Sequence, residues 1–342
     1  MVVILVTGNQ GYIGTVMTKM LKEASYKVLG LDNDWFKEGY FFYPDDILPD
    51  KQITKDIRHI TDNDLDGVEA VIHLAAISND PLGELNPCVT EQINTHATIQ
   101  LAKLCKKRKI GRFIFASSCS IYGIVENGMP ISEQGILNPQ TAYAKAKVNA
   151  ENQLKELAND NFHPILMRNA TVYGSSPKLR LDLVVNQLAA YAYLTGEIRV
   201  LSDGTPWRPL IHIEDFCRAF MKILEVPKEK NYQVFNVGIN NGNYQIKDIA
   251  FEIQKSLPHT KIKIARELQS DERTYRVDFS KIKESLDFKP RWNLKKGIME
   301  LIEDFKKNDL TLNDFKSNKY FRIRTIQSYL ETKKMDKNLF WL

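Results

Sequence analysis

The sequence has little cysteine, no long hydrophobic run and little net charge, and each absence excludes a class of protein. Its four cysteines, Cys88, Cys105, Cys119 and Cys217, show no Cys-x-x-Cys spacing and no histidines at metal-ligand intervals. We therefore expect reduced thiols and no metal site. The apolar opening at residues 2–6 is far too short for a membrane span, and no basic leader precedes it. These features predict a cytoplasmic protein without a membrane partner.

The chain has a small excess of positive charge, which is less than is typical of a nucleic-acid-binding protein. The formal net charge is +5 over 342 residues, and lysine and arginine alternate with aspartate and glutamate. The densest basic run, residues 106–109, is typical of the solvated end of a helix. We expect no nucleic-acid partner. Because a single core stops growing at roughly 250–300 residues, the length predicts two lobes.

The first half of the chain alternates short β-branched runs with longer helical patterns, which is typical of βαβ units. Strands are expected at residues 2–6, 28–31, 70–74, 112–116 and 164–167, and helices at residues 14–23, 90–107 and 142–157. Such strands are buried on both faces of a parallel sheet. The pattern predicts an α/β fold with a Rossmann-type doubly wound parallel sheet, which binds ligands beyond the carboxyl ends of its strands.

The pattern changes at about Gly174, where longer loops and helices interrupted by proline begin. We expect residues 1–173 to form the dinucleotide-binding domain. Residues 174–342 are expected to form mainly a smaller α/β substrate lobe, with some chain returning to the first sheet. Strands are expected in this part at residues 233–237 and 261–264.

The end of the chain holds a helical-looking stretch at residues 323–333 and a last apolar run, Phe-Trp-Leu. Tyr329 and Lys333 lie at i and i+4 in this stretch, and no cofactor motif is near them in the sequence. We interpret this pair as a helix surface.

A glycine-rich turn follows the first predicted strand and opens the first helix. Gly8, Gly11 and Gly14 would allow a tight turn, close approach to a pyrophosphate and close helix packing. The helix N-terminus would hold the phosphates. Such a turn alone can be a plain connection, but Asp32 ends the second strand. A carboxylate there accepts hydrogen bonds from the two adenosine ribose hydroxyls and repels a 2′-phosphate, so NAD is the predicted cofactor.

Several motifs occur together in a fixed order. They are TGNQGYIG at residues 7–14, HLAA at 73–76, Asn94, FASSCSIYG at 115–123, Tyr143-x-x-x-Lys147, RNATVYG at 168–174, RPLIHIEDF at 208–216 and VFNVG at 234–238. In this order and spacing the chain resembles the extended short-chain dehydrogenase/reductase family, which includes NAD-dependent nucleotide-sugar epimerases and dehydratases. The resemblance covers nearly the whole chain.

The resemblance implies a catalytic trio. Tyr143 would be the acid/base, Lys147 would lower its pKa and hold the nicotinamide ribose, and Ser118 would hydrogen-bond the reacting sugar oxygen. Residues at i and i+4 of a helix share one face, so Tyr143 and Lys147 would project into the same space. A free phenol has a pKa near 10, so abstracting an alcohol proton at neutral pH requires positive charge nearby.

The motifs and the resemblance together imply two sets of contacts. The cofactor contacts are Gly8, Gln10, Gly11, Tyr12, Ile13, Gly14, Asp32, Asn33, Asp56, Ile57, Leu74, Ala75, Ala76, Asn94, Tyr143 and Lys147. The contacts with a nucleotide-diphosphate sugar substrate are Ser78, Asn79, Ser118, Ser120, Asn169, Arg180, Arg208 and Arg273. The arginines are chosen because a planar guanidinium binds phosphate oxygens with two hydrogen bonds.

Departures from the family's patterns narrow the chemistry. The 4,6-dehydratases carry an Asp-Glu pair directly after the catalytic hydroxyl, whereas this chain has Cys119 and Ser120. Dehydration is therefore disfavoured, and Cys119 is interpreted as a packing residue. Hydride transfer at one sugar carbon, C4, remains, either in a 4-epimerase or in a 4-dehydrogenase or 4-ketoreductase. Residues 176–192 resemble those of members in surface-polysaccharide pathways. A catalytically inactive NAD-binding sensor or scaffold is the alternative from another class.

The resemblance also implies a homodimer. Relatives pair through the helices that correspond to residues 90–107 and 142–157. The apolar residues that could serve in this interface are Leu101, Leu104, Val148 and Leu154.

Overall fold

A seven-stranded parallel sheet forms the centre of the computed structural model, which describes residues 2–43, 47–125, 128–226, 232–265 and 273–342. The order across the sheet is β10-β6-β5-β4-β1-β2-β3. The strands are β1 (Val3–Thr7), β2 (Lys27–Asp32), β3 (Lys51–Thr54), β4 (Ala70–His73), β5 (Arg112–Ser118), β6 (His163–Asn169) and β10 (Gln233–Val237). Every neighbouring pair runs parallel. The predicted fold class is confirmed.

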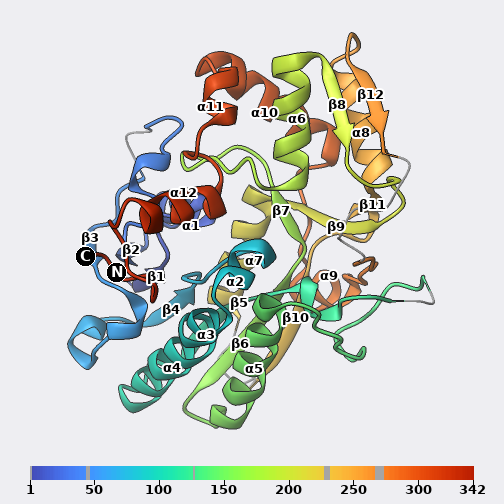
Figure 1. Ribbon diagram of the computed structural model, residues 1–342. Helices are drawn as coiled ribbons and strands as arrows, with labels where there is room; N and C mark the ends of the chain where they lie inside the picture. Colours follow the sequence, from blue (N-terminus) through green and yellow to red (C-terminus); the bar gives the residue numbers. More distant parts are fainter. Residues whose placement is uncertain (1, 44–46, 126–127, 227–231, 266–272) are drawn as a thin grey trace.

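Helices cover both faces of this sheet (Figure 1). One face carries α1 (Tyr12–Glu23), α7 (Ile213–Glu225) and α9 (Ser280–Leu286). The other carries α2 (Asp80–Leu85), α3 (Pro87–Glu91), a π-helical segment (Gln92–Ala97), α4 (Thr98–Lys107), α5 (Ala142–Leu157) and α12 (Arg322–Glu331). Short 3₁₀ turns lie at Lys37–Gly39, Ile57–His59, Asp62–Leu65, Cys119–Tyr122 and Asn240–Gly242. Within the described ranges, none of the helices is both long and apolar enough to cross a membrane.

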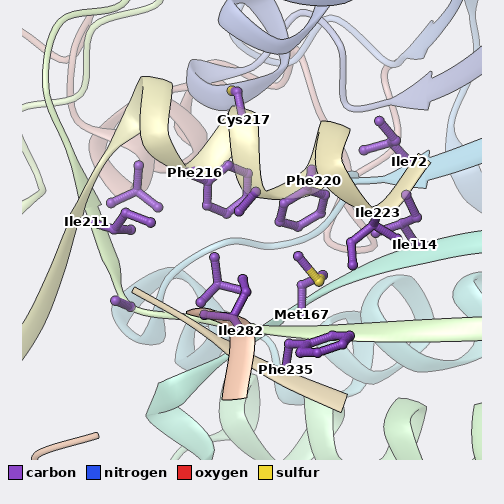
Figure 2. Packing of buried hydrophobic residues seen from close by; sticks show 14 of the residues in the cluster. Ile72, Ile114, Met167, Ile211, Phe216, Cys217, Phe220, Ile223, Phe235 and Ile282 are labelled. Carbon is purple, nitrogen blue, oxygen red and sulfur yellow. The ribbon is translucent and has the colours of Figure 1, made fainter. Parts of the chain in front are cut away.

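The face under α7 is packed by large side chains at helical spacing. Ile213, Phe216 and Phe220 recur on one side of α7, and each is at most 1% exposed. Figure 2 shows Phe216 and Phe220 directed from the helix toward Met167 of β6 and its neighbours. The rings of Phe216 and Phe220 stack with centroids 4.4 Å apart. Because each buried aromatic side chain contributes about 1.5–3 kcal/mol, this seam holds α7 to the sheet.

The opposite face corrects two of the expectations. Leu101 and Leu154 are fully buried in the core of the single chain, so they are not available to a dimer interface. Tyr329 is also buried in this core, and α12 ends at Glu331, before Lys333. The interpretation of Tyr329 and Lys333 as a helix surface is therefore wrong.

A second lobe stands at one end of the sheet (Figure 1). It contains a three-stranded sheet of β11 (Asn243–Gln245), β9 (Trp207–His212) and β7 (Thr171–Tyr173), and a two-stranded sheet of β12 (Lys261–Ile264) and β8 (Glu197–Val200). Its helices are α6 (Val184–Thr195), α8 (Ile246–Ser256), α10 (Leu294–Lys307) and α11 (Leu312–Lys316). These elements share a separate apolar core. The segment Gln233–Val237 instead returns to the central sheet, beside β6.

The order of the strands reverses direction between β1 and β4. From β1 the chain continues to β2 and β3 on one side, and it then crosses to β4 on the other side of β1. The connections therefore diverge at this point and leave a crevice at the carboxyl ends of the strands. The residues that follow β1 and β4 border this crevice.

The aromatic seam under α7 gives a test of the packing. Phe220→Ala removes a buried ring and leaves a cavity, so the free energy of unfolding should fall by about 3–5 kcal/mol. Urea denaturation followed by circular dichroism measures this change. Lys222→Ala, on the exposed side of the same helix, is the control and should change stability by less than about 0.5 kcal/mol. Equal effects of the two variants would contradict the packing described here.

Candidate active site

The glycine-rich turn between β1 and α1 leaves no space for side chains. Gly8 adopts a φ of 72°, which favours glycine, and a Cβ there would lie 2.8 Å from the backbone nitrogen of Ala75. A Cβ on Gly14 would collide with the carbonyl oxygen of Gly8. Gly11 occupies the N-cap position of α1, so no side chain there accepts a hydrogen bond from the first turn of the helix. The first N–H groups of this helix therefore remain available to an anion.

Asp32 ends β2 next to this turn and is held by backbone donors. Its Oδ2 accepts a hydrogen bond from the Gln10 nitrogen at 3.1 Å, and its Oδ1 accepts one from the Asp34 nitrogen at 3.0 Å. Burial raises the pKa of the Asp32 carboxyl, and these two hydrogen bonds oppose that shift. The carboxylate is thus fixed in position at the edge of the crevice.

Ser118, Tyr143 and Lys147 meet at the carboxyl end of β5. Thr141 caps α5 by accepting a hydrogen bond from the Ala144 nitrogen at 3.1 Å, and Tyr143 lies in the first turn of this helix. The Tyr143 hydroxyl is hydrogen-bonded to the Ser118 side chain. The Lys147 Nζ donates to the Ala116 carbonyl oxygen at 2.7 Å and lies 5.9 Å from the centre of the Tyr143 ring. The predicted trio is therefore brought together.

Burial shifts the pKa values of Tyr143 and Lys147 in opposite directions. Burial, and next the charge of Asp80, raise the pKa of Tyr143 to about 12, and the hydrogen bond from Ser118 lowers it by less. Burial lowers the pKa of Lys147 to about 7, against a smaller opposing effect of Glu151. Burial is thus the largest cause of the pKa shift at both groups when the cofactor is not bound. That Lys147 lowers the pKa of Tyr143 in the working enzyme stays a prediction.

A buried network of polar side chains lies next to the trio and holds the elements that carry it. Glu151, one turn after Lys147 on α5, accepts a hydrogen bond from the Ser117 hydroxyl at 2.5 Å and pairs with Arg168 of β6 at 2.7 Å. Arg168 also donates to the Tyr122 hydroxyl at 3.1 Å. Because each member is satisfied, the network fixes α5 against β5 and β6.

Two buried polar atoms near the trio lack partners. Among the described residues, neither the Ser120 Oγ nor the Asn169 Oδ1 has a hydrogen-bond partner, although both are buried. The Asn169 Nδ2 donates to the Ser117 carbonyl oxygen at 2.8 Å, which orients the amide. Buried orphan acceptors are costly and mark places where a ligand supplies the missing bond. Cys119 is buried and donates to the Arg168 carbonyl oxygen, so its interpretation as packing is confirmed.

The three predicted arginines line the same cavity as the trio. Arg180 pairs with Asp182 at 2.9 Å and donates to the Ser78 hydroxyl at 3.1 Å. Arg273 pairs with Asp80, and Arg208 donates to the carbonyl oxygen of Arg273.

Asn79 belongs to the same wall as the arginines. Its Nδ2 donates to Asp182 Oδ2 at 2.8 Å. The serine and asparagine of the β4 loop and the three guanidinium groups thus form one charged surface, and together with the trio they line a cavity of about 480 Å³.

The family model described as NAD dependent epimerase/dehydratase family matches residues 4–238. The chain belongs to this family. It is similar to the putative UDP-glucose 4-epimerase of Methanocaldococcus jannaschii, with 29% identity over 321 residues that cover 90% of this chain and 100% of that protein. It is also similar to UDP-glucuronic acid decarboxylase 5 of Arabidopsis thaliana, with 26% identity over 319 residues and 89% of both chains covered.

A solved structure agrees with this assignment. UDP-glucuronic acid 4-epimerase from Bacillus cereus, in complex with UDP-glucuronic acid and NAD, superposes with a TM-score of 0.76. The identity is 25%, and the match covers 89% of this chain and 99% of that one. The resemblance to the extended short-chain dehydrogenase/reductase family is thereby confirmed.

NAD is the cofactor of this family, and the site fits it. The glycine turn has no room for side chains and is followed by an uncapped helix start, which suits a phosphate. The partly buried carboxylate of Asp32 suits a ribose. The cavity continues without a break from this turn to Tyr143 and Lys147.

Most predicted cofactor contacts lie on the cavity wall, and three do not. Gln10, Asp56 and Asn94 are missing from the described residues that form it. The Asp56 carboxylate pairs with Arg58 at 2.7 Å. The Asn94 amide bonds both the nitrogen and the oxygen of Ile77, at 2.8 and 2.9 Å. In the structure the Asp56 and Asn94 side chains therefore hold neighbouring loops. That they also contact the cofactor stays a prediction.

Sequence reasoning missed several residues of the wall. Asp182 is one of them, and Phe36, Arg322 and Ile323 are others. Arg322 and Ile323 belong to α12, so the end of the chain returns to the cofactor half of the crevice. The apolar pattern of residues 323–333 indicated packing, but nothing local could show against what.

The buried lysine gives a prediction about stability. The pKa of Lys147 in the fold, about 7, lies below its usual 10.5. Between these pH values the unfolded chain binds more protons than the folded one, so the parent gains stability as pH rises. Lys147→Met lacks this gain. Its free energy of unfolding relative to the parent should therefore decrease, by about 1 kcal/mol or more, from pH 7 to pH 9.5.

Urea unfolding without added NAD at the two pH values measures this difference. Lys145→Met, at an exposed position of the same helix, is the control and should show no such pH dependence. A constant difference between Lys147→Met and the parent would mean that Lys147 keeps its charge in the fold.

Proposed function

We propose that the protein is an NAD-dependent epimerase of a nucleotide-diphosphate sugar, which acts by hydride transfer at C4. The grouping of Ser118, Tyr143 and Lys147 with unpartnered polar atoms and arginines in one cavity carries this proposal. The relatives named above act on UDP-linked sugars, which supports the same substrate class. The glycine turn and Asp32 would hold the phosphates and the adenosine ribose of the cofactor.

The protein's groups divide the work at the sugar. Tyr143 would take the proton of the C4 hydroxyl and later return it, and Ser118 would hold the same sugar oxygen through its hydroxyl. Lys147 would bind the nicotinamide ribose and supply charge when protonated. When bound, NAD would supply the hydride acceptor and a positive charge. Because the hydride returns, the reaction consumes no net oxidant.

The arginines and the loop after β4 would bind the rest of the substrate. Arg208 donates to the main-chain carbonyl oxygen of Arg273, and both residues line the cavity. We expect their guanidinium groups to bind one diphosphate between them. Ser78 and Asn79 would bind sugar hydroxyls, and Ser120 and Asn169 would use their unpartnered atoms for the same purpose. No carboxylate pair follows Ser118, so removal of water is not expected.

A panel assay tests this function. The purified protein is incubated with NAD and GDP-, UDP-, CDP- and dTDP-linked sugars, and the products are weighed and chromatographed. We expect a product of unchanged mass and altered retention. Tyr143→Phe should lower kcat by about 10²–10⁴-fold without loss of NAD binding, because only the hydroxyl is removed. Tyr26→Phe, at the amino end of β2, is the matched control and should keep full activity.

Other outcomes would reject the proposal in distinct ways. A product lighter by two hydrogens would identify a dehydrogenase that releases NADH, and reduction of an added 4-keto sugar would identify a ketoreductase. No turnover across the panel, with NAD still bound, would favour the sensor or scaffold.

We also propose that the protein is a homodimer paired through α4 and α5. These helices lie side by side on one face (Figure 1), and Leu104 and Val148 remain partly exposed on them. Sedimentation velocity at micromolar concentration should give twice the mass of 39.4 kDa. Val148→Glu together with Leu104→Glu should shift it to monomer. A parent that sediments only as monomer would refute the dimer.

A further inference from the structure

The end of the chain is fastened to the cofactor half of the molecule. We name residues 318–342 the tail. The Trp341 Nε1 donates to the Asn33 carbonyl oxygen at 2.8 Å, directly after Asp32. The Phe340 ring stacks on His59 at 5.1 Å, and the Arg58 guanidinium lies 3.5 Å above it. In Figure 1 the C-terminus accordingly lies beside the edge formed by β1, β2 and β3. The tail therefore has a fixed place over this edge.

Arg322, the first residue of α12, is the cation that the tail brings to the cavity. It is 3% exposed and lies on the cavity wall together with Ile323 and Phe36. Its guanidinium carbon lies 3.9 Å from the centre of the Phe36 ring. Among the described residues its Nη1 has no hydrogen-bond partner. A buried donor on a charged group is costly to leave unpaired, so this position calls for an acceptor.

The nearby carboxylates are engaged with other groups. Asp32 accepts from the nitrogens of Gln10 and Asp34, and Asp182 pairs with Arg180 and accepts from Asn79. Both acids attract Arg322 at a distance, since they raise its pKa, whereas burial and Arg180 lower it to about 9. The guanidinium is thus held charged at neutral pH beside the crevice, with donor capacity left over.

We propose that Arg322 is a cofactor ligand that donates to the adenosine diphosphate half of NAD, and that the tail covers this half of the site. The position supports this half, because Asp32 ends β2 and Asn33 and Phe36 follow it. In the sheet, β2 lies away from β5, which carries Ser118 beside Tyr143. A guanidinium supplies five donors in a planar fork that fits phosphate and ribose oxygens. The inference rests on NAD as the family's cofactor and not on the identity of the sugar.

The covering tail has a consequence for cofactor exchange. NAD held under a segment that packs into the core through Ile326 and Tyr329 leaves only when that segment moves. Slow release suits an enzyme that returns the hydride to the same substrate. A dehydrogenase, in contrast, must exchange its cofactor in every turnover.

Binding measurements on the full chain test the proposal without any sugar substrate. Dissociation constants for NAD and for ADP are measured by calorimetry on the parent and on Arg322→Gln. We expect both constants to rise by about 10- to 100-fold, as for loss of a hydrogen bond to a charged group. Arg324→Gln, an exposed arginine on the same helix, is the matched control and should leave both constants unchanged.

A second variant separates ligand binding from folding. Arg322→Lys keeps the positive charge but loses the planar fork, so it should weaken ADP binding by several-fold with an unchanged unfolding midpoint. If circular dichroism shows that Arg322→Gln is unfolded, the ADP affinity of Arg322→Lys decides the test instead. Unchanged ADP affinity in a folded Arg322 variant would overturn the proposal. Weaker NAD binding with unchanged ADP binding would also overturn it, because the contact would then lie in the nicotinamide half.

Discussion

The parallel direction of the seven strands is the constraint on which the site depends. Because all the strands point the same way, the residues that follow them meet at one edge of the sheet, although they are far apart in the sequence. Gly8 follows β1, Asp32 ends β2, Leu74 follows β4, Ser118 ends β5 and Asn169 ends β6. A strand running in the opposite direction would carry its residue to the far edge. The seam under α7 and the Glu151–Arg168 pair hold this edge in place.

Buried charge is the second common feature of the site. Lys147 and Arg322 are buried and Asp32 is partly buried, and burial is the largest cause of the pKa shift at each of them. Desolvated charge lowers stability unless a partner compensates for it. The core aromatics gain stability from the same burial. The free-energy cost of desolvating charge is therefore concentrated where a dinucleotide and a diphosphate would supply partners. Binding sites are commonly less stable than the rest of a fold for this reason.

The sequence predicted local features well and long-range ones poorly. The helix Ala142–Leu157 was predicted with its observed bounds, because a helical pattern of residues is a local signal. The glycine turn and Asp32 were likewise found from their spacing. Whether Leu101 and Leu154 face the core or a partner depends on what packs against them, which periodicity cannot show. Arg322 lies at the cavity because the tertiary fold brings α12 back to the first domain, and no local pattern in the sequence indicates this. The Tyr143 pKa depends on burial, which no spacing reveals.

The protonation of the trio also argues for a gated reaction. With a pKa of about 12, Tyr143 keeps its proton at neutral pH, so by itself it is an acid and not a base. Burial lowers the pKa of Lys147 to about 7, so this lysine supplies less positive charge at neutral pH than an exposed one. In the proposed reaction, proton abstraction would need further positive charge at the site, and oxidised NAD would supply it. The base would therefore become effective only when a hydride acceptor is present beside it. A tail that keeps the cofactor in place would keep the site in this competent state through successive turnovers.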